Sequence, residues 1–237
     1  MIELHQVSVT VSLPQAGRKP IAKTLLSEVS LSLAERRVAV IGANGSGKST
    51  LLRLLNGLVL PTAGRVLVDG LDTATQVRQV RARVGFIFTD PLAQLLMGTA
   101  LDDVELSLRD QVRDKAARRA RALELLAERG LADLAEQSVY DLSGGERQLV
   151  SLTSVLATQP ELVVADEPTT LLDLRNRNTV VAALCGLPQQ LILATHDLEL
   201  AAQADRVVVV DAGRIVADGA PARTIDCYRR LMRDDRP

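Results

Sequence analysis

The sequence predicts an α/β protein built on a mostly parallel sheet, and three features of the chain predict this class. Continuously apolar strands at 161–166, 190–195 and 206–210 alternate with helical segments, which is typical of a parallel sheet covered on both faces. The strand RVAVI at 37–41 runs through a glycine-rich loop into a helix. Residues 1–41 have the patterns of β-structure, so we expect further strands before the parallel ones.

Three further segments of the chain have the patterns of strands. The N-terminal segment MIELHQVSVTV alternates apolar and polar residues as a half-buried strand does, and it lacks the basic start and apolar block of a signal peptide. GRVLVDG at 64–70 predicts another strand that ends in a turn. Near the C-terminus, DAG at 211–213 followed by RIVADG predicts a closing hairpin.

The middle of the chain, from about residue 89 to 141, has the periodicity of helices, and the segment 109–130 predicts an amphipathic helix. The expected apolar face of this helix consists of Val112, Ala116, Ala120, Leu123 and Ala127. The remaining positions are mostly charged, which is typical of a solvated helix face. An arginine face that binds nucleic acid is the alternative, and the interspersed aspartates and glutamates count against it.

Composition narrows the class of protein further. The 237 residues suffice for one sizeable hydrophobic core, and no stretch reaches the roughly 18 consecutive apolar residues of a membrane span. Lys and Arg total 28 against 29 Asp and Glu, whereas a protein that works mainly on nucleic acid is usually more basic. Cys185 and Cys227 have no metal-binding or redox spacing, so we expect thiols in a reducing compartment.

The segment GANGSGKST satisfies the pattern of a phosphate-binding loop, and it lies between a predicted strand and a predicted helix. The backbone N–H groups of such a loop surround an anion. Lys48 is expected to reach the β- and γ-phosphates of a nucleotide, and Ser49 to offer its hydroxyl to Mg²⁺. The predicted nucleotide-binding residues of this loop are Gly42, Ala43, Asn44, Gly45, Ser46, Gly47, Lys48, Ser49 and Thr50.

Two further motifs complement the loop. In LVVADE, a buried strand places Asp166 and Glu167 at its carboxyl end, where ligands of such sheets bind. We expect Asp166 to belong to the coordination shell of Mg²⁺, and we expect Glu167 to activate the attacking water. In LSGGE, Ser143 is a good helix N-cap, and the helix directs its positive end forward. The start of this helix is therefore a second anion site in the chain. Two such sites are redundant in one subunit, unless each subunit of a dimer completes the site of the other.

The phosphate loop, LSGGE, LVVADE and THD at 195–197 resemble, in this order and spacing, the ATP-binding-cassette (ABC) ATPase domain. The resemblance covers essentially the whole chain and implies one ABC ATPase domain over 1–237. It implies a P-loop NTPase core with a mostly parallel sheet, an N-terminal antiparallel β subdomain and an α-helical subdomain inserted at roughly 89–150. It also implies ATP hydrolysis coupled to transport, with ATP and Mg²⁺, in a head-to-tail homodimer.

The resemblance also implies roles for individual residues. Lys48, Glu167 and His196 are expected to be catalytic, with His196 sensing the γ-phosphate. The implied nucleotide contacts outside the loop are Ser143, Gly144 and Gly145, toward the γ-phosphate bound by the partner subunit, and Asp173 of the loop that links the two sites. The implied metal-site residues are Ser49, Asp166 and Thr89.

Three stretches depart from the family pattern. The loop before Asp173 reads Thr170-Leu171-Leu172, which is bulkier than the usual small residues. Thr89 replaces a glutamine that touches Mg²⁺ and the attacking water; because threonine is shorter, we expect a weaker or water-mediated metal contact, while the loop keeps a mechanical role. The aromatic residue that usually stacks on adenine is missing near Val9–Val11, where the chain reads VSVTV. Adenine is therefore expected to lie on an aliphatic surface, with loose base selectivity.

The segment DPLAQLLMGTALDDVELSL resembles that of ATPases in energy-coupling-factor importers of vitamins and metals. There, a glutamine corresponding to Gln94 begins a short helix beside the groove for the transmembrane coupling protein. FTDPLAQ, with threonine, most resembles the biotin importers, so we expect biotin; another vitamin, cobalt or nickel is the alternative. The implied partners are a second ATPase subunit, a transmembrane coupling protein and a substrate-binding membrane protein, with no nucleic acid, at the cytoplasmic face of the inner membrane.

Two other functions compete with transport. One is a cassette ATPase that acts on DNA or ribosomes, but such relatives carry long coiled-coil insertions or two cassettes in one chain, and neither is present here. The other is a non-catalytic nucleotide-binding regulator, and the intact Lys48, Asp166, Glu167 and His196 count against it.

Overall fold

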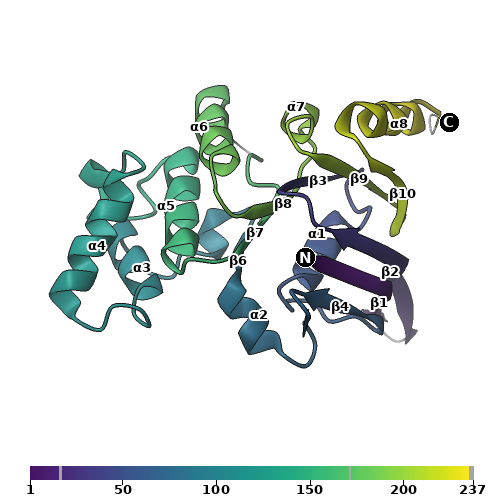
Figure 1. The fold of residues 1–237 in the computed structure, drawn as a ribbon, viewed down its shortest axis with the longest axis horizontal. Helices are drawn as coiled ribbons and strands as arrows, with labels where there is room; N and C mark the ends of the chain where they lie inside the picture. The colour runs from purple at the N-terminus through teal and green to yellow at the C-terminus, as the bar shows by residue number, and fades with distance from the viewer. Residues whose placement is uncertain (16–17, 171, 235–237) are drawn as a thin grey trace. The chain divides into compact units, whose positions relative to one another are not determined.

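The computed structural model describes residues 1–15, 18–170 and 172–234, and Figure 1 shows their helices and strands. The chain forms two compact units. The first combines Met1–Val84 with Gln190–Pro237, and the second is Gly85–Gln189. The chain thus leaves the first unit once and returns to it once, and the segment expected to be helical at 89–150 falls inside the second.

The first unit contains an antiparallel sheet with the strand order β2-β1-β4-β5. Its strands are β1 (Ile2–Gln15), β2 (Arg18–Leu33), β4 (Ala63–Val68) and β5 (Leu71–Asp72). Strict alternation along β1 would bury Gln6 and Ser8, but a β-bulge with Gln6 at φ 48° shifts the register between Leu4 and Val7. The buried residues of β1 are therefore Ile2, Leu4, Val7 and Val9.

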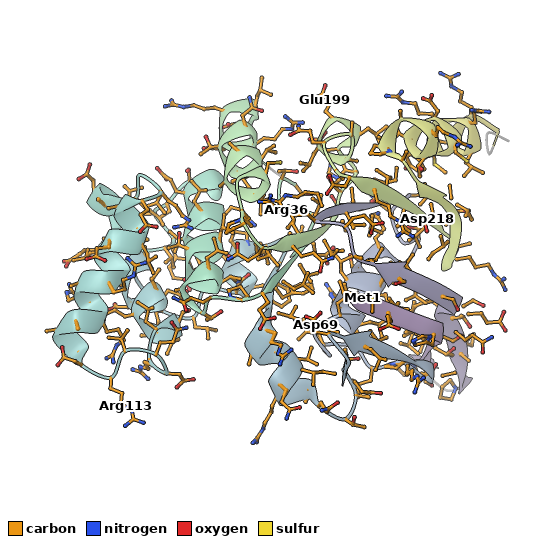
Figure 2. All side chains as sticks on the ribbon, viewed as in Figure 1. Met1, Arg36, Asp69, Arg113, Glu199 and Asp218 are labelled. Atoms are coloured by element: carbon orange, nitrogen blue, oxygen red, sulfur yellow. The ribbon has the colours of Figure 1, made fainter. Side chains whose placement is uncertain are left out.

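The start of the chain is fixed to the turn between β4 and β5. The N-terminal ammonium of Met1 pairs with the Asp69 carboxylate, and the Asp69 N–H donates to the Met1 carbonyl at 2.9 Å. Figure 2 labels both residues, which lie close together beside this sheet. These contacts hold the first strand in register at the sheet's end.

The same unit contains the strand order β10-β9-β3-β8. Strand β3 (Arg37–Ile41) runs parallel to β8 (Gln190–Ala194) and to β9 (Arg206–Asp211), and β10 (Arg214–Gly219) is antiparallel to β9. Ala212 and Gly213 both have positive φ, 44° and 77°, as a type I′ hairpin turn requires, which confirms the expected closing hairpin. The parallel strands bring their carboxyl ends to one edge, where the glycine-rich loop begins.

Helices accompany both sheets of the first unit. They are α1 (Lys48–Leu54), α2 (Val77–Arg83), α7 (Leu198–Ala201) and α8 (Pro221–Asp234). Helix α1 contacts β8, α7 contacts β3, and α8 lies against β9 and β10 (Figure 1). None of the helices formed by the described residues combines the length and the apolar character needed to cross a membrane.

The second unit pairs two strands with a helical bundle. Strand β6 (Val84–Ile87) neighbours β7 (Leu162–Asp166). The helices are the short 3₁₀ turns η1 (Pro91–Ala93) and η2 (Ala132–Leu134), with α3 (Ala100–Ser107), α4 (Lys115–Ala127), α5 (Gly144–Ala157) and α6 (Leu174–Cys185). Helix α5 contacts α3, α4 and α6 (Figure 1), so it forms the centre of this bundle.

The amphipathic helix expected at 109–130 is α4, but the prediction of its buried face was wrong. Four residues of the predicted face, Ala116, Ala120, Leu123 and Ala127, are exposed, and Val112 lies before the helix begins. The buried residues are Ala122, Leu125 and Leu126. Alanines occur on several sides of this helix, so their spacing does not identify the buried face. The adjacent Leu125 and Leu126 mark that face, because leucines bury far more apolar area than alanines do.

Candidate functional site

The phosphate-loop sequence forms the connection between β3 and α1. Strand β3 is buried over Val38–Ile41, so it anchors the loop in the core of the first unit. Gly42 and Gly47 have φ of 155° and 113°. A Cβ at Gly42 would lie 2.1 Å from the Val210 carbonyl oxygen, and one at Gly47 would lie 2.9 Å from that of Leu25. Close backbone approach therefore requires glycine at both positions.

Lys48 bends back over the loop. Its side chain is buried, and its ammonium donates to the carbonyl oxygens of Gly42 at 2.8 Å and Ala43 at 3.1 Å. A cavity of about 180 Å³ opens beside the loop, and its lining residues are Lys23, Leu25, Gly45, Gly47, Lys48, Ser49 and Thr50. The positive charge of Lys48 thus lies where the backbone N–H groups of the loop would receive an anion.

The cavity includes a residue that sequence reasoning missed. Lys23, on β2, adds a second ammonium group to the lining. It pairs across the sheet with Val11, so the hairpin β1–β2 brings it to the loop. Val9 is buried, which leaves the half-buried Val11 as the accessible aliphatic residue of the two. No local motif marks Lys23, because its position depends on strand register.

His196 leaves the parallel sheet at the same edge as the loop. Val40 of β3 pairs with Ala194 of β8, and the Thr195 N–H donates to the Val40 carbonyl at 3.1 Å. Gly42 lies two residues after Val40, and His196 lies two residues after Ala194 and is exposed. The neighbouring Asp197 caps α7 by accepting from the N–H groups of Glu199 and Leu200. The fold of the first unit therefore places His196 beside the phosphate loop.

Asp166 and Glu167 lie at the carboxyl end of β7, in the second unit. All five residues of β7 are buried, and Asp166 is only 1% exposed. Glu167 follows with φ 51°, a left-handed conformation that costs a non-glycine residue about 1–2 kcal/mol. The Thr170 hydroxyl donates to Glu167 Oε2 at 3.3 Å, and the Thr170 N–H donates to the Glu167 carbonyl at 3.2 Å.

Thr89 lies two residues beyond the end of β6 and contacts the backbone at the end of β7. Its hydroxyl donates to the carbonyl oxygen of Asp166 at 2.8 Å. The proton of this hydroxyl is thus directed at the backbone of β7. The sequence predicted a weaker or water-mediated metal contact for Thr89 and did not predict this bond.

The LSGGE residues begin helix α5 with a complete capping box. Ser143 Oγ accepts from the Glu146 N–H at 3.3 Å, and Glu146 Oε2 accepts from the Ser143 N–H at 2.7 Å. Hydrogen bonds that the Glu146 carboxylate accepts from the Ser143 hydroxyl and from the Ser143 N–H hold the pKa of Glu146 below its ordinary value. The capping box therefore fixes Ser143 and Glu146 together at the start of α5.

Asp173 supports the LSGGE segment through a residue that sequence reasoning missed. Asp173 caps α6 by accepting from the Asn176 N–H at 2.8 Å, and it also accepts from the Asn176 side-chain amide at 3.0 Å. Asn176 in turn packs under Gly145, where a Cβ would lie 2.4 Å from Asn176 Cγ. Only long-range packing creates this contact, so no sequence pattern marks it.

Comparison with known proteins agrees with this arrangement. The family model for ABC transporters matches residues 26–170, which include the phosphate loop, LSGGE and the end of β7. This chain belongs to the ABC transporter family. It is an ATP-hydrolysing transport ATPase, and the α/β fold expected from the sequence is confirmed.

Individual relatives of this ABC ATPase carry more specific names. It is 43% identical to the biotin transport ATP-binding protein BioM of Rhizobium etli, over 94% of this chain and 99% of that protein. It is 42% identical to the energy-coupling factor transporter ATP-binding protein EcfA1 of Symbiobacterium thermophilum, over 78% of this chain and 66% of that protein. Among solved structures, it resembles the dimeric, post-hydrolysis state of the ATP-binding cassette MJ0796 bound to ADP and Pi, with TM-score 0.83, 29% identity and coverage of 93% and 99%.

The donor groups of this ABC ATPase suit Mg²⁺ in chemistry. Ser49 offers a hydroxyl and Asp166 a carboxylate, and both are the hard oxygen ligands that Mg²⁺ prefers. Within the part of the chain that the structure describes, no three His, Cys, Asp or Glu side chains gather as a metal-binding group.

Proposed function

We propose that this ABC ATPase binds and hydrolyses ATP to energise an energy-coupling-factor importer, and that the imported solute is biotin. The observation that carries the proposal is the high identity, over nearly the whole chain, to a biotin transport ATP-binding protein. The identity to an energy-coupling factor ATPase supports the broader class. The buried anchoring of the segment after Thr89, described below, supports a membrane partner.

In the first unit, the phosphate loop and Lys48 bind the nucleotide phosphates. The burial of Lys48 and its bonds to two loop carbonyls support this role, because they hold the ammonium inside the loop. Ser49 offers its hydroxyl to Mg²⁺, and His196 contacts the γ-phosphate from the neighbouring strand end. The position of His196 two residues beyond the β3–β8 pairing supports that contact.

In the second unit, Asp166 and Glu167 serve the metal and the attacking water. Asp166 is an Mg²⁺ ligand, and bound Mg²⁺ would neutralise charge that develops on the phosphate oxygens. Glu167 accepts the proton of the attacking water. The left-handed backbone of Glu167 supports this role, since strained conformations cluster at functional sites.

Two copies act together as a head-to-tail homodimer, in which Ser143, Gly144 and Gly145 of one subunit contact the γ-phosphate bound by the other. The capping box supports this, because it fixes Ser143 at the start of α5, where the positive end of the helix dipole favours an anion. Asp173 supports the same segment through Asn176. The dimeric state of the similar cassette MJ0796 also favours a dimer.

The residues after Thr89 contact the transmembrane coupling protein at the cytoplasmic face of the membrane. Leu92, Leu96 and Met97 expose apolar surface there, and the Leu96 side chain is 77% exposed. Gln94 closes the segment by accepting from the Phe88 N–H at 3.1 Å. Buried Asp103 fixes its far end through the N–H groups of Leu96 and Met97. An apolar surface on a rigid support is suited to transmitting force.

Purification of the native complex tests this function. We would tag the chain in its own cells, extract it in mild detergent, identify the proteins that copurify and measure the binding of labelled biotin to the complex. Small membrane proteins together with tight biotin binding support the whole proposal. Membrane proteins without biotin binding keep the importer and point to another vitamin, cobalt or nickel. Ribosomal or DNA-repair proteins instead of membrane proteins overturn the transport role.

A further inference from the structure

The Thr89 hydroxyl bonds to the peptide group that connects the two carboxylates. The carbonyl of Asp166, which accepts this bond at 2.8 Å, belongs to the same planar peptide as the N–H of Glu167. A bond to that oxygen therefore restrains the rotation of the whole peptide unit. The restraint acts on the first backbone atom of Glu167 rather than on its side chain.

The location of the bond explains why a short side chain is suited to it. Asp166 is the last residue of β7, and β6 ends at Ile87, so the ladder between the two strands stops before Thr89. A carbonyl at a buried strand end requires a hydrogen-bond donor. The threonine hydroxyl supplies one directly from its β-carbon. A glutamine amide, two carbons further out, would reach past the same oxygen.

Glu167 has a backbone conformation that requires restraint. Its φ of 51° lies in the left-handed region, which is unfavourable for a glutamate unless its surroundings hold it. Thr170 restrains the residue from the other side, through its N–H to the Glu167 carbonyl and its hydroxyl to Oε2. Glu167 is thus held by a threonine before it and a threonine after it.

We propose that Thr89 is a positioning residue for ATP hydrolysis: its hydroxyl fixes the Asp166–Glu167 peptide and thereby keeps Glu167 in the left-handed conformation that aims its carboxylate. The inference rests on the proposed role of Glu167 in activating water. It also links that role to the membrane partner, because Thr89 directly precedes the segment that exposes Leu92, Leu96 and Met97. A movement of that segment pulls on the bond to Asp166 and so changes the setting of Glu167.

The test compares Thr89→Val, which has the same shape without a donor, with Thr89→Ser, which restores the donor. For the full-length ATPase we would measure kcat, KM for ATP, the Mg²⁺ concentration for half-maximal activity, and the affinity for labelled ATP. Thr89→Val is expected to lower kcat about 10-fold, equivalent to about 1.4 kcal/mol of activation free energy. KM, ATP affinity and the Mg²⁺ requirement are expected to stay near wild type, and Thr89→Ser to recover most of kcat.

Three results would overturn the inference. One is an unchanged kcat in Thr89→Val. Another is a raised Mg²⁺ requirement in Thr89→Val, since that identifies the hydroxyl as a metal contact. The third is a kcat in Thr89→Ser as low as in Thr89→Val. If Thr89→Val fails to fold, as judged by loss of ATP binding, Thr89→Ala replaces it in the same comparison with Thr89→Ser.

A parallel Glu167→Gln variant separates this inference from the proposed function. If Glu167→Gln hydrolyses ATP at the wild-type rate, the role of Glu167 is wrong, whatever Thr89 does. If Glu167→Gln abolishes hydrolysis while Thr89→Val remains at the wild-type kcat, only the positioning role of Thr89 is wrong.

Discussion

Asp103 offers a direct test of how the proposed coupling segment is held. This carboxylate is 5% exposed, yet it accepts three hydrogen bonds. Oδ1 accepts from the N–H groups of Leu96 at 2.8 Å and Met97 at 3.2 Å, and Oδ2 accepts from the Ser154 hydroxyl at 2.7 Å. Asp103→Ala removes all three bonds, whereas Asp103→Asn keeps an oxygen for the two N–H groups and turns its amide toward Ser154, whose hydroxyl can accept.

The size of the effect follows from these bonds. Each buried partner that loses its hydrogen bond costs about 1–3 kcal/mol of stability. Because the segment is exposed at Leu96, water can replace part of the lost bonding there, so we expect a total cost of about 3 kcal/mol for Asp103→Ala. For a chain of this length, 1 kcal/mol lowers Tm by about 2–4 °C, which gives a decrease of about 6–12 °C. Asp103→Asn is expected to cost about 1 kcal/mol, or about 2–4 °C.

Thermal unfolding of the two variants would be measured beside a matched control, Asp102→Ala. Asp102 is the adjacent residue, only half-buried, and its Oδ2 accepts from the Thr99 hydroxyl at 2.8 Å. We expect a decrease of about 2–4 °C or less for the control. Limited proteolysis should cut Asp103→Ala faster within residues 94–99 than it cuts the wild type. If Asp103→Ala unfolds no earlier than Asp102→Ala, or if Asp103→Asn is as unstable as Asp103→Ala, the reasoning is refuted.

Three further predictions follow from the site. Glu167→Gln should lower hydrolysis about 100-fold or more while ATP-bound dimers persist on size-exclusion chromatography, whereas Lys48→Ala should lose ATP binding itself; hydrolysis by Glu167→Gln near the wild-type rate would contradict this. Gly145→Ala should lower Tm by roughly 2–12 °C because its Cβ would lie 2.4 Å from a side chain of α6, whereas Gly144→Ala, whose nearest atom is at 3.4 Å, should barely change it. Equal Tm values for the two variants would argue against the packing. The pKa of Glu146 is lowered in the folded state, so the ionised carboxylate stabilises the fold at neutral pH, and this stabilisation is lost as the pH falls below the ordinary value of 4.5. The Tm difference between wild type and Glu146→Gln, measured by calorimetry across that pH range, should therefore shrink in acid. A Tm difference that stays constant would count against this prediction.

Much of the fold could be predicted because its signals are local. Strand β3 was predicted with its observed bounds, and β7 and β8 to within one residue, because a continuously apolar strand is bounded by residues that cannot continue it. The phosphate loop is equally local, since its glycines and Lys48 are neighbours in sequence. The face of α4 was missed because apolar spacing alone does not weigh a leucine above an alanine.

The side-chain contacts of the site could not be predicted, for the opposite reason. Thr89 and Asp166 are 77 residues apart, and the hydroxyl of one finds the carbonyl of the other only once β6 and β7 lie side by side. Ser154 and Asp103 are 51 residues apart and meet only where α5 packs on α3. Such pairs leave no periodic pattern, so the sequence showed Thr89 as an unusual residue without showing what it binds.

The same distinction affects how the two glycines of the LSGGE segment should be interpreted. Gly145 is excluded from carrying a side chain by Asn176, which Asp173 holds in place, so a loss of activity in Gly145→Ala would report packing as well as any contact with phosphate. Gly144 has room for a methyl group within its own unit, since the nearest atom to its Cβ would be Leu172 Cδ2 at 3.4 Å. A large loss of hydrolysis in Gly144→Ala with an unchanged Tm would therefore locate the effect in front of the helix, where the partner's nucleotide is proposed to bind. Wild-type hydrolysis in Gly144→Ala would argue against close approach of a phosphate at that position.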